Sequence, residues 1–505
     1  MRKDQTNIHN RRLSGYPAST ATLPARHLPA LLLAGLLLGG CAAVGPDYQR
    51  PETALPAAWS GAAGDKSGSR AEDISEWWKG LKDPMLDQLV DESLAASPDL
   101  LTARARLREA RARRQLAGAE RLPDVTASGS ASRSKGSGET GTGTTRNLFS
   151  AGLDAGWEPD IFGATRRGIE AAQADLEASG ANLDGVQVSL VAEVALNYVD
   201  LRAYQTRLDI ARNNLASQSE TLRIAEWRNQ AGLVSALDVD QARTNLEQTR
   251  AQIPTLETNL AQAEHRLAFL LGQAPTSLHD RLATPAAIPQ VADSLAIGIP
   301  ADTLRRRPDV RAAERKLAAE TARIGVATAA LYPGFRLSGS IGLDALSLGD
   351  LFSASAISRS LAASVAGTLF DGGRLRKRVE IQDAVQEQAL VSYQTTVLTA
   401  LKEVEDALVA LAHSGQRREA LGRAFAAAGN AASLARQRYA SGLIDFQAVL
   451  DSERSLLSTQ DNLAGADADR VTALIQLYKA LGGGWTAQPP SAQTPSSSNT
   501  PRNPS

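Results

Sequence analysis

The chain repeats itself at a fixed distance, and this constrains its fold more than any other feature of its 505 residues. The stretch "SPDLLTARARLREA" from Ser97 matches "RPDVRAAERKLAAE" from Arg307, and "AGLVSALDV" from Ala231 matches "SGLIDFQAV" from Ser441. Both pairs lie 210 residues apart, as do "LPDVTASGS" with "YPGFRLSGS" and "LLGQ" with "ALGG". A constant offset predicts two structural repeats, 75–275 and 307–484.

The segments outside the repeats differ from them in composition. The connector 276–306 contains the Pro-rich run "ATPAAIPQVADSLAIGIP", and 485–505 is a tail of Pro, Ser and Thr. Such a tail cannot bury enough apolar surface to order itself, so we predict disorder there. The net charge of −1 gives no field that would attract nucleic acid or an acidic substrate.

The chain begins with basic residues followed by the apolar run "LLLAGLLLGGC", which ends on its only cysteine. This order is typical of a secretory signal, and the run is too short to span a bilayer as a helix. Gly39 and Gly40 before Cys41 resemble the bacterial lipobox. We therefore predict a lipoprotein signal peptide at 1–40, lipid attachment at Cys41 and a lipid-anchored segment at 41–74. The alternative is an ordinary signal peptide with an unrelated cysteine.

Within each repeat the pattern predicts a helix, two strands, a long helix and a further helix. The first helix covers 98–122, with Ser97 as its N-cap and Pro98 in its first turn. Alternation of apolar and small polar residues predicts strands within 125–132, 147–157, 335–343 and 360–369. Leucines recur every seven residues in the helical stretches, at Leu201, Leu208, Leu215 and Leu222 for example. Pro254 should kink or break the helix predicted at 236–272.

The predicted lengths lead to an oligomer. A helix of about 68 residues is about 100 Å long, and the two shorter helices of a repeat together match that length. Such rods must share their apolar seams with neighbours, and four strands cannot close a barrel or leave open edges in lipid. Three chains solve both problems. The predicted class is α+β: a trimer with a 12-stranded transmembrane β-barrel continuous with a tube of helices, a coiled-coil barrel.

Several long motifs resemble one family, the outer-membrane efflux proteins of the TolC superfamily, in its NodT lipoprotein branch. They are "CAAVGPDYQRPETALPAAW", "WWKGLKDPMLDQLVDESLAASPDLL", "RRRPDVRAAERKLAAETARIGVATAALYPGFRLSGSIG" and "LFDGGRLR". The resemblance implies a homotrimer anchored in outer-membrane lipid and extending into the periplasm. It also implies docking to a periplasmic adaptor protein and an inner-membrane efflux pump, with substrates conducted passively to the exterior.

The resemblance also implies a periplasmic gate at the turns between the long and short helices. Asp451 stands where relatives place a ring of aspartates, with Gln447 one turn earlier. Ala448 occupies the place of a second aspartate that this chain lacks. Three Asp451 carboxylates around one axis would attract cations into the pore, although Asp451 could also simply face solvent. Tyr439 and Asp238 match a polar pair that latches the closed helices, while Ile444 replaces an arginine partner.

Other classes of protein fit the residues less well. Beyond the signal only His265, His279 and His413 remain and no cysteine cluster exists, so we expect no metal site, no cofactor and no enzyme. A periplasmic adaptor would carry one helical hairpin between β-domains, whereas this chain repeats its hairpin set. A channel for type I secretion or metal efflux stays open. The basic stretch "RARLREARARR" is interpreted as a solvated helix face rather than a nucleic-acid site.

Overall fold

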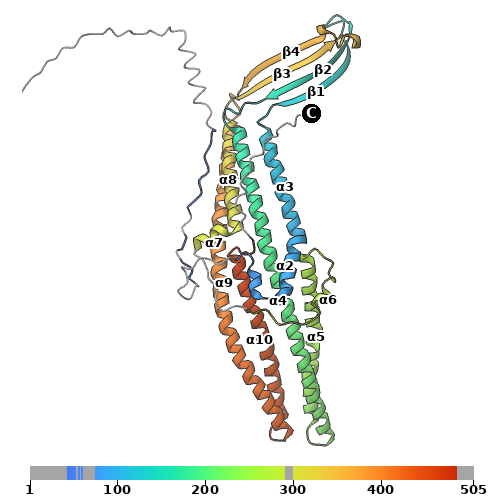
Figure 1. Ribbon diagram of the computed structural model, residues 1–505, viewed down its shortest axis with the longest axis vertical. Coiled ribbons are helices and arrows are strands. Elements are labelled where there is room, and N and C mark those ends of the chain that lie inside the picture. Colours follow the sequence, from blue (N-terminus) through green and yellow to red (C-terminus); the bar gives the residue numbers. More distant parts are fainter. Residues whose placement is uncertain (1–42, 53–54, 57, 61–73, 291–299, 486–505) are drawn as a thin grey trace, which may run out of the picture.

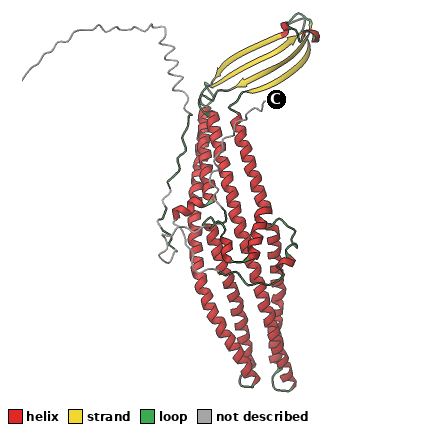
Figure 2. Cartoon of the chain, in the orientation of Figure 1, coloured by secondary structure: helices red, strands yellow, loops and turns green. Residues whose placement is uncertain are grey.

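The molecule is an elongated bundle of helices with a small β-sheet at one end (Figures 1 and 2). The computed structural model describes residues 43–52, 55–56, 58–60, 74–290 and 300–485. The predicted signal peptide 1–40, the lipid attachment at Cys41 and residues 486–505 of the predicted tail lie outside them. Among the helices in these ranges, none combines the length and the apolar character that a membrane crossing requires.

Two helices of 67 residues run most of the length of the bundle, as the heptad pattern predicts. They are α4 (Ala164–Gln230) and α9 (Arg374–Ala440). The shorter elements, in chain order, are η1 (Trp77–Leu81), α2 (Pro84–Ala96), α3 (Pro98–Ala119), α5 (Ala236–Leu270), α6 (His279–Leu282), α7 (Pro300–Arg306), α8 (Pro308–Ala329), η2 (Leu348–Asp350), η3 (Ala354–Ala356) and α10 (Phe446–Ala480). The bounds of α3, α4 and α5 recur 210 residues later in α8, α9 and α10.

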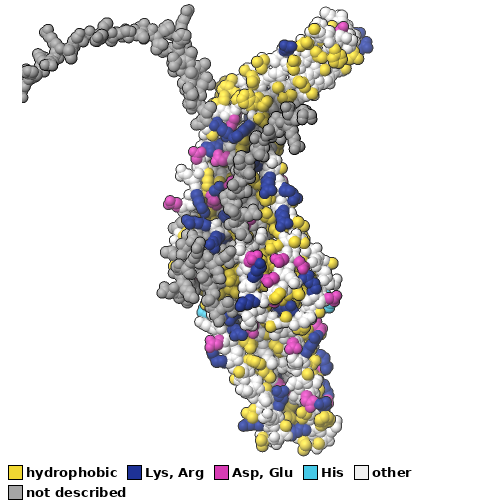
Figure 3. Space-filling view, viewed as in Figure 1, with side chains coloured by type: hydrophobic (Ala, Val, Ile, Leu, Met, Phe, Trp, Pro, Cys, Tyr) yellow, Lys and Arg dark blue, Asp and Glu magenta, His cyan; other side chains and the backbone are white. Residues whose placement is uncertain are grey.

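The four strands form one antiparallel sheet in the order β1-β2-β3-β4, and the prediction of four strands is confirmed. Their bounds are β1 (Asp124–Lys135), β2 (Thr145–Trp157), β3 (Gly334–Ala345) and β4 (Ile357–Ala366). The register pairs Leu153 with Ile341 and Gly339 with Leu361, so the predicted apolar residues share one exposed face. Apolar side chains cover much of the sheet in Figure 3. Among the described residues, β1 and β4 each keep one edge without a strand partner.

The helices pack side by side in rows. Next to the sheet the order is α3, α4, α8, α9, and in the far half it is α5, α4, α10, α9 (Figure 1). Two hairpins, α4 with α5 and α9 with α10, therefore form the far end of the molecule. They contact one another mainly through α4 and α10.

The largest apolar core lies midway along the bundle, and we call it the equatorial core. It joins side chains of η1, α2, α4, α5 and α10 with the segment after α5: Trp78, Leu86, Leu89, Val191, Tyr198, Leu201, Leu267, Leu278 and Ile475 are among its buried members. The hydroxyl of Tyr198 donates to Asp83 Oδ2 at 2.7 Å. Asp83 also caps α2 by accepting from the backbone N–H of Met85 at 2.9 Å.

The structure refines three details of the predicted helices. Pro254 does not break its helix, since α5 continues through it and the Thr258 hydroxyl bonds the Pro254 carbonyl at 2.8 Å. Ser97 occupies the N-cap position of α3, but its side chain makes no capping bond. Its backbone N–H instead closes α2 by donating to Ser93 O at 2.9 Å, which fixes Ser97 between the two helices. The first helix also ends at Ala119, short of the predicted residue 122.

Candidate functional site

The two hairpin turns that carry the predicted gate are built alike. After α4, Gly232 adopts a φ of 71°, and after α9, Gly442 adopts a φ of 72°, a left-handed conformation that glycine reaches without strain. The next residues, Leu233 and Leu443, donate backbone hydrogen bonds to Arg228 O at 2.8 Å and Arg438 O at 2.9 Å. Both leucines stay exposed at the tips.

The following helices begin at polar N-caps. Ser235 and Asp238 form a capping box at the start of α5, and Asp445 accepts from Ala448 N at 3.0 Å at the start of α10. A small apolar cluster closes the tip beneath the turns. It contains Ala225, Val239, Ala242, Ala435, Tyr439, Phe446, Val449 and Leu450. Each turn is therefore fixed by its own local bonds.

The structure brings two of the predicted gate residues together. Gln447 donates to Asp451 Oδ1 at 2.9 Å, and both side chains are exposed on α10. Ala448 lies between them in the sequence, is half-buried, and gives its N–H to the Asp445 cap. The Asp451 carboxylate is thus held on the helix surface by an uncharged neighbour and stays exposed to solvent.

The predicted latch residues are not joined within the chain. Asp238 accepts from the backbone N–H of Ser235 at 3.0 Å, so its carboxylate serves the capping box of α5. Tyr439 is buried, and its hydroxyl has no hydrogen-bond partner among the described residues. Its ring instead packs against Phe446, with centroids 5.2 Å apart, and beneath the Arg228 guanidinium at 4.5 Å.

A row of polar contacts, which we call the hairpin seam, joins the two hairpins. Four residues of α4 spaced seven apart each reach across to α9 or α10. Arg207 pairs with Asp461 at 2.6 and 2.9 Å, and Asn214 donates to Gln460 Oε1 at 2.7 Å. Thr221 donates to Glu453 Oε1 at 2.9 Å, and Arg228 donates to the carbonyl of Tyr439 at 3.0 Å. Seven-residue spacing places all four on one stripe of α4.

Around the seam, several buried polar atoms have no hydrogen-bond partner in the part of the chain that the structure describes. These are both amide atoms of Gln218, Nδ2 of Asn245, Oε2 of Glu453 and the hydroxyl of Tyr439. Burial raises the pKa of the Glu453 carboxyl, while its bond from Thr221 and the charge of Arg436 oppose the rise. Each unpartnered buried group weakens the association of the hairpins by about 1–3 kcal/mol relative to a paired one.

The sequence did not predict this seam, because the leucine heptad on α4 indicated a different buried stripe. Asn214 is buried, whereas its neighbour Leu215, which belongs to the predicted apolar heptad, is only half-buried. A signal was nevertheless present in the sequence, because Arg207, Asn214, Thr221 and Arg228 repeat every seven residues directly beside the leucines.

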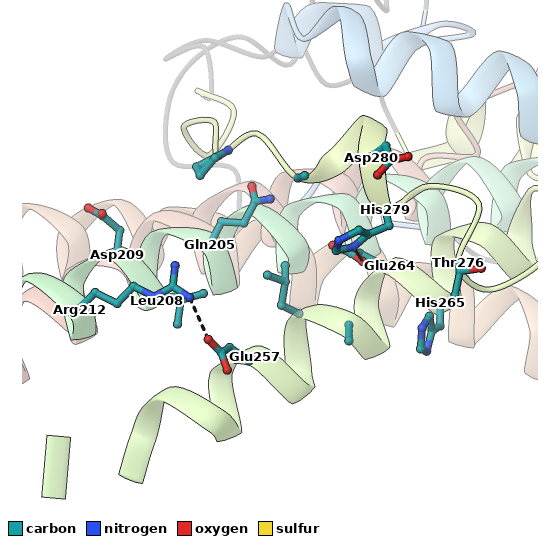
Figure 4. Close-up of a pocket in the computed structure, with 14 residues that line it drawn as sticks. Gln205, Leu208, Asp209, Arg212, Glu257, Glu264, His265, Thr276, His279 and Asp280 are labelled. Carbon is teal, nitrogen blue, oxygen red and sulfur yellow. Dashed lines mark hydrogen bonds and ion pairs between the residues drawn. The ribbon is translucent and has the colours of Figure 1, made fainter. Parts of the chain in front are cut away.

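A pocket of about 590 Å³ lies between α4, α5 and the segment around α6 (Figure 4). It contains two of the histidines, His265 and His279, with Asp280 beside the latter. His279 Nδ1 lies 3.0 Å from Oε2 of the buried Glu264, and this carboxylate raises the pKa of the imidazole. Arg212 pairs with Glu257 at 2.8 Å across the pocket. In the described ranges, no three His, Cys, Asp or Glu side chains are grouped to hold a metal ion.

Comparison with known proteins identifies the family. The profile described as "Outer membrane efflux protein" matches the chain twice, over residues 89–273 and 299–483. This chain belongs to the outer membrane efflux protein family. It is an outer-membrane component of an efflux system, and the fold described above is that of an efflux channel.

Relatives and solved structures of this efflux channel family align along nearly all of the chain. Nodulation protein T of Rhizobium leguminosarum bv. trifolii is 36% identical over 459 residues, which cover 89% of this chain and 96% of the relative. Outer membrane protein OprJ of Pseudomonas aeruginosa is 32% identical over 468 residues, covering 92% and 96%. The solved outer-membrane channel OprN is 40% identical with a TM-score of 0.83, and covers 88% of this chain and all of that one.

The comparisons favour the channel over the periplasmic adaptor that the sequence left as an alternative. The matching family is described as an outer membrane efflux protein, and the solved relative OprN is described as an outer-membrane channel. Cargo stays open, because relatives named for pyoverdine export and for toluene efflux are 34% and 33% identical to this chain. One fold thus serves chemically different substrates.

Proposed function

We propose that three copies of this efflux channel assemble into a closed tunnel that conducts substrates passively from a periplasmic adaptor and an inner-membrane pump to the exterior. The observation that carries this proposal is the open edge of the single chain. In the described ranges, strands β1 and β4 have no outer strand partner, and the edge helices α3 and α9 below them expose apolar side chains. A sheet edge left open in lipid is costly, so closure with further copies supplies the missing hydrogen bonds.

Lipid attachment at Cys41 is supported by the position of the segment that follows it. Val44 donates its backbone N–H to Phe162 O at 3.0 Å, next to the N-terminus of α4 where the helices meet the sheet. The buried Arg167 holds the segment through bonds to Val44 O and Gly45 O at 3.2 Å and to Asp47 at 2.7 Å. Three residues span at most about 10 Å, so acyl chains on Cys41 would lie near the base of the sheet.

From there the segment continues along the bundle. Leu55 packs beside the buried Tyr393 and Val397, and Trp59 is buried against Val404 and Leu477. The N–H of Ser60 donates to Glu405 at 2.7 Å. The anchored segment thereby fixes the height of the helical bundle relative to the membrane surface.

The gate is proposed at the hairpin tips. In a trimer, three Asp451 carboxylates exposed on α10 would surround the axis and attract cations, with Gln447 orienting each of them. The latch between Tyr439 and Asp238 stays a prediction for the assembled form. It would require the Asp238 carboxylate to leave Ser235, or to bond both partners at once.

The test is the conductance of the purified lipidated protein in a planar bilayer, wild type beside Asp451→Ala. We expect small, cation-selective openings that become larger or less selective in the variant. Asp240→Ala, which removes an exposed carboxylate from the other hairpin, is the matched control and should behave like wild type. If Asp451→Ala left the conductance and selectivity of the pore unchanged, the proposed gate at Asp451 would be wrong. If neither protein conducted, the proposed conducting tunnel would be wrong.

A further inference from the structure

The basic stretch of α3 contains an arginine that the fold leaves without a partner. Leu100, Ala103 and Ala110 pack α3 against α4, and the opposite face carries Leu101, Ala105, Arg108, Ala112 and Leu116 at helical spacing. Leu101 is 51% exposed and Leu116 is 67% exposed, so this is an unpartnered apolar stripe. Arg108 stands in its middle and makes no hydrogen bond or ion pair with any described residue. Figure 3 shows several basic side chains over the region where α3 runs.

The other edge helix presents the complementary arrangement. Tyr393, Val397 and Ala400 of α9 are buried within the chain. The opposite face carries Ala384, Glu387, Val391 and Leu398, again at helical spacing. Val391 is 54% exposed and Leu398 is 65% exposed. Glu387 lies between these apolar residues, and it too has no ion pair or hydrogen bond in the described part of the chain.

The two unpaired charges lie at nearly the same level below the sheet. Helix α3 ends at Ala119 and leads into β1, whereas β4 leads into α9 at Arg374. At 1.5 Å per residue, Arg108 lies about 17 Å from the sheet end of α3 and Glu387 about 20 Å from that of α9. When the open edge of β4 meets the open edge of β1 in another copy, the helices below them meet as well.

We infer that Arg108 of one copy forms an ion pair with Glu387 of the next, inside an otherwise apolar seam between α3 and α9. This inference rests on the proposed assembly and names the contact that fixes its register. A charged pair within an apolar helix interface disfavours every alignment that leaves either charge buried alone. The partner of each stripe is therefore a second copy of this chain. Arg108 and Glu387 have opposite charges and lie at nearly the same distance below the sheet.

Cross-linking tests the contact directly. Cys41 is the only native cysteine, and in the proposed lipoprotein its sulfur carries the lipid, so Arg108→Cys with Glu387→Cys introduces two free thiols. Oxidation, or a short bis-maleimide, should convert the lipidated protein into covalent trimers on a non-reducing gel. The matched control is Arg108→Cys with Lys402→Cys. Lys402 is exposed on the same face of α9 but lies 15 residues beyond Glu387, about 22 Å along the helix, and should not cross-link.

Charge reversal tests the energetics. Arg108→Glu or Glu387→Arg alone should lower the trimer fraction in native mass spectrometry by roughly tenfold, and the double reversal should restore it to within about twofold. Trimers that form without the predicted cross-link, or single reversals without effect, would overturn this contact and leave the trimer intact. A wild-type protein that stays monomeric would overturn the proposed assembly, and a cross-link to a different protein would assign the stripe to that partner instead.

Discussion

The equatorial core and the hairpin seam use the same helix, α4, in opposite ways. In the equatorial core, α4 contributes Val191, Tyr198 and Leu201, all fully buried among apolar side chains. Farther along, the positions that face α9 and α10 are Asn214, Thr221 and Arg228, which form hydrogen bonds. Apolar burial is lost when water enters, whereas water can replace a hydrogen bond at a net cost of only about 1 kcal/mol.

This difference assigns different mechanical properties to the two regions. Separating α4 from its neighbours at the equator exposes a large apolar surface. Separating the hairpins exposes the polar groups of the seam and the smaller apolar cluster at the tips. The tips, where the gate is proposed, thus expose less apolar surface on opening than the equator would. The equatorial core fixes one end of each hairpin, so that the tips can move apart while the middle of the bundle stays packed.

The largest effect is expected from weakening the equatorial core. Leu267→Ala removes a fully buried side chain and should destabilise the fold by about 2–5 kcal/mol, because the cavity cannot collapse in a packed interior. Guanidinium unfolding of the detergent-solubilised protein measures the change. The control, Leu237→Ala, alters an exposed residue of α5 and should have little effect. Similar losses in both variants would show that the equator is not the main source of stability.

A smaller effect is expected from breaking one contact of the seam. Asn214→Leu leaves the Gln460 amide without its partner and should cost about 1–3 kcal/mol, whereas Asn214→Leu with Gln460→Leu removes both polar groups and should be neutral or stabilising. Hydrogen exchange of the amides of α9 and α10 near the tips reports the change.

In conductance recordings, the double variant should also open less often than wild type, because its hairpins adhere through an apolar contact. If the double variant were as destabilised as the single one, the two side chains would not act as a pair. The seam would then not differ from the equatorial core in the way its helices are held together.

The smallest effect is expected from proton binding at the seam. Because burial raises the pKa of Glu453, the folded hairpins bind its proton more tightly than the unfolded chain does. Stability should therefore fall as the pH rises from the ordinary pKa of the carboxyl to its raised value in the fold. Glu453→Gln removes this dependence and should be more stable than wild type above that window, on the order of 1 kcal/mol.

Hydrogen exchange of the tip amides between about pH 4 and about pH 8 measures this pH dependence. Asp240→Asn, at an exposed position on the other hairpin, is the control and should leave the exchange of the tip amides unchanged. A Glu453→Gln variant with an unchanged profile would mean that another group titrates in the bundle.

The fold was predicted from patterns that can be recognised in the sequence without knowledge of the tertiary contacts. The alternation around Leu153 and Ile341 depends on residues close together in the sequence, and the 210-residue offset shows that such local patterns occur twice along the chain. The fate of Pro254 could not be predicted, since packing along α5 compensates for one missing backbone hydrogen bond. Packing also determines the contacts of Tyr439 and Asp238 within one chain, which are made with Phe446, Arg228 and a local cap. The latch between them stays a prediction for the assembled form.

By itself the sequence determined the two repeats, the lengths of the rods and the four strands, because periodicity and turn chemistry act over a few residues. Only the tertiary structure decided which stripe of each helix is buried. On α4, apolar and polar heptads run side by side, with Leu215 next to Asn214, and both satisfy the same spacing. Which of the two stripes is buried depends on the helices packed against α4, and these helices come together only in the folded chain.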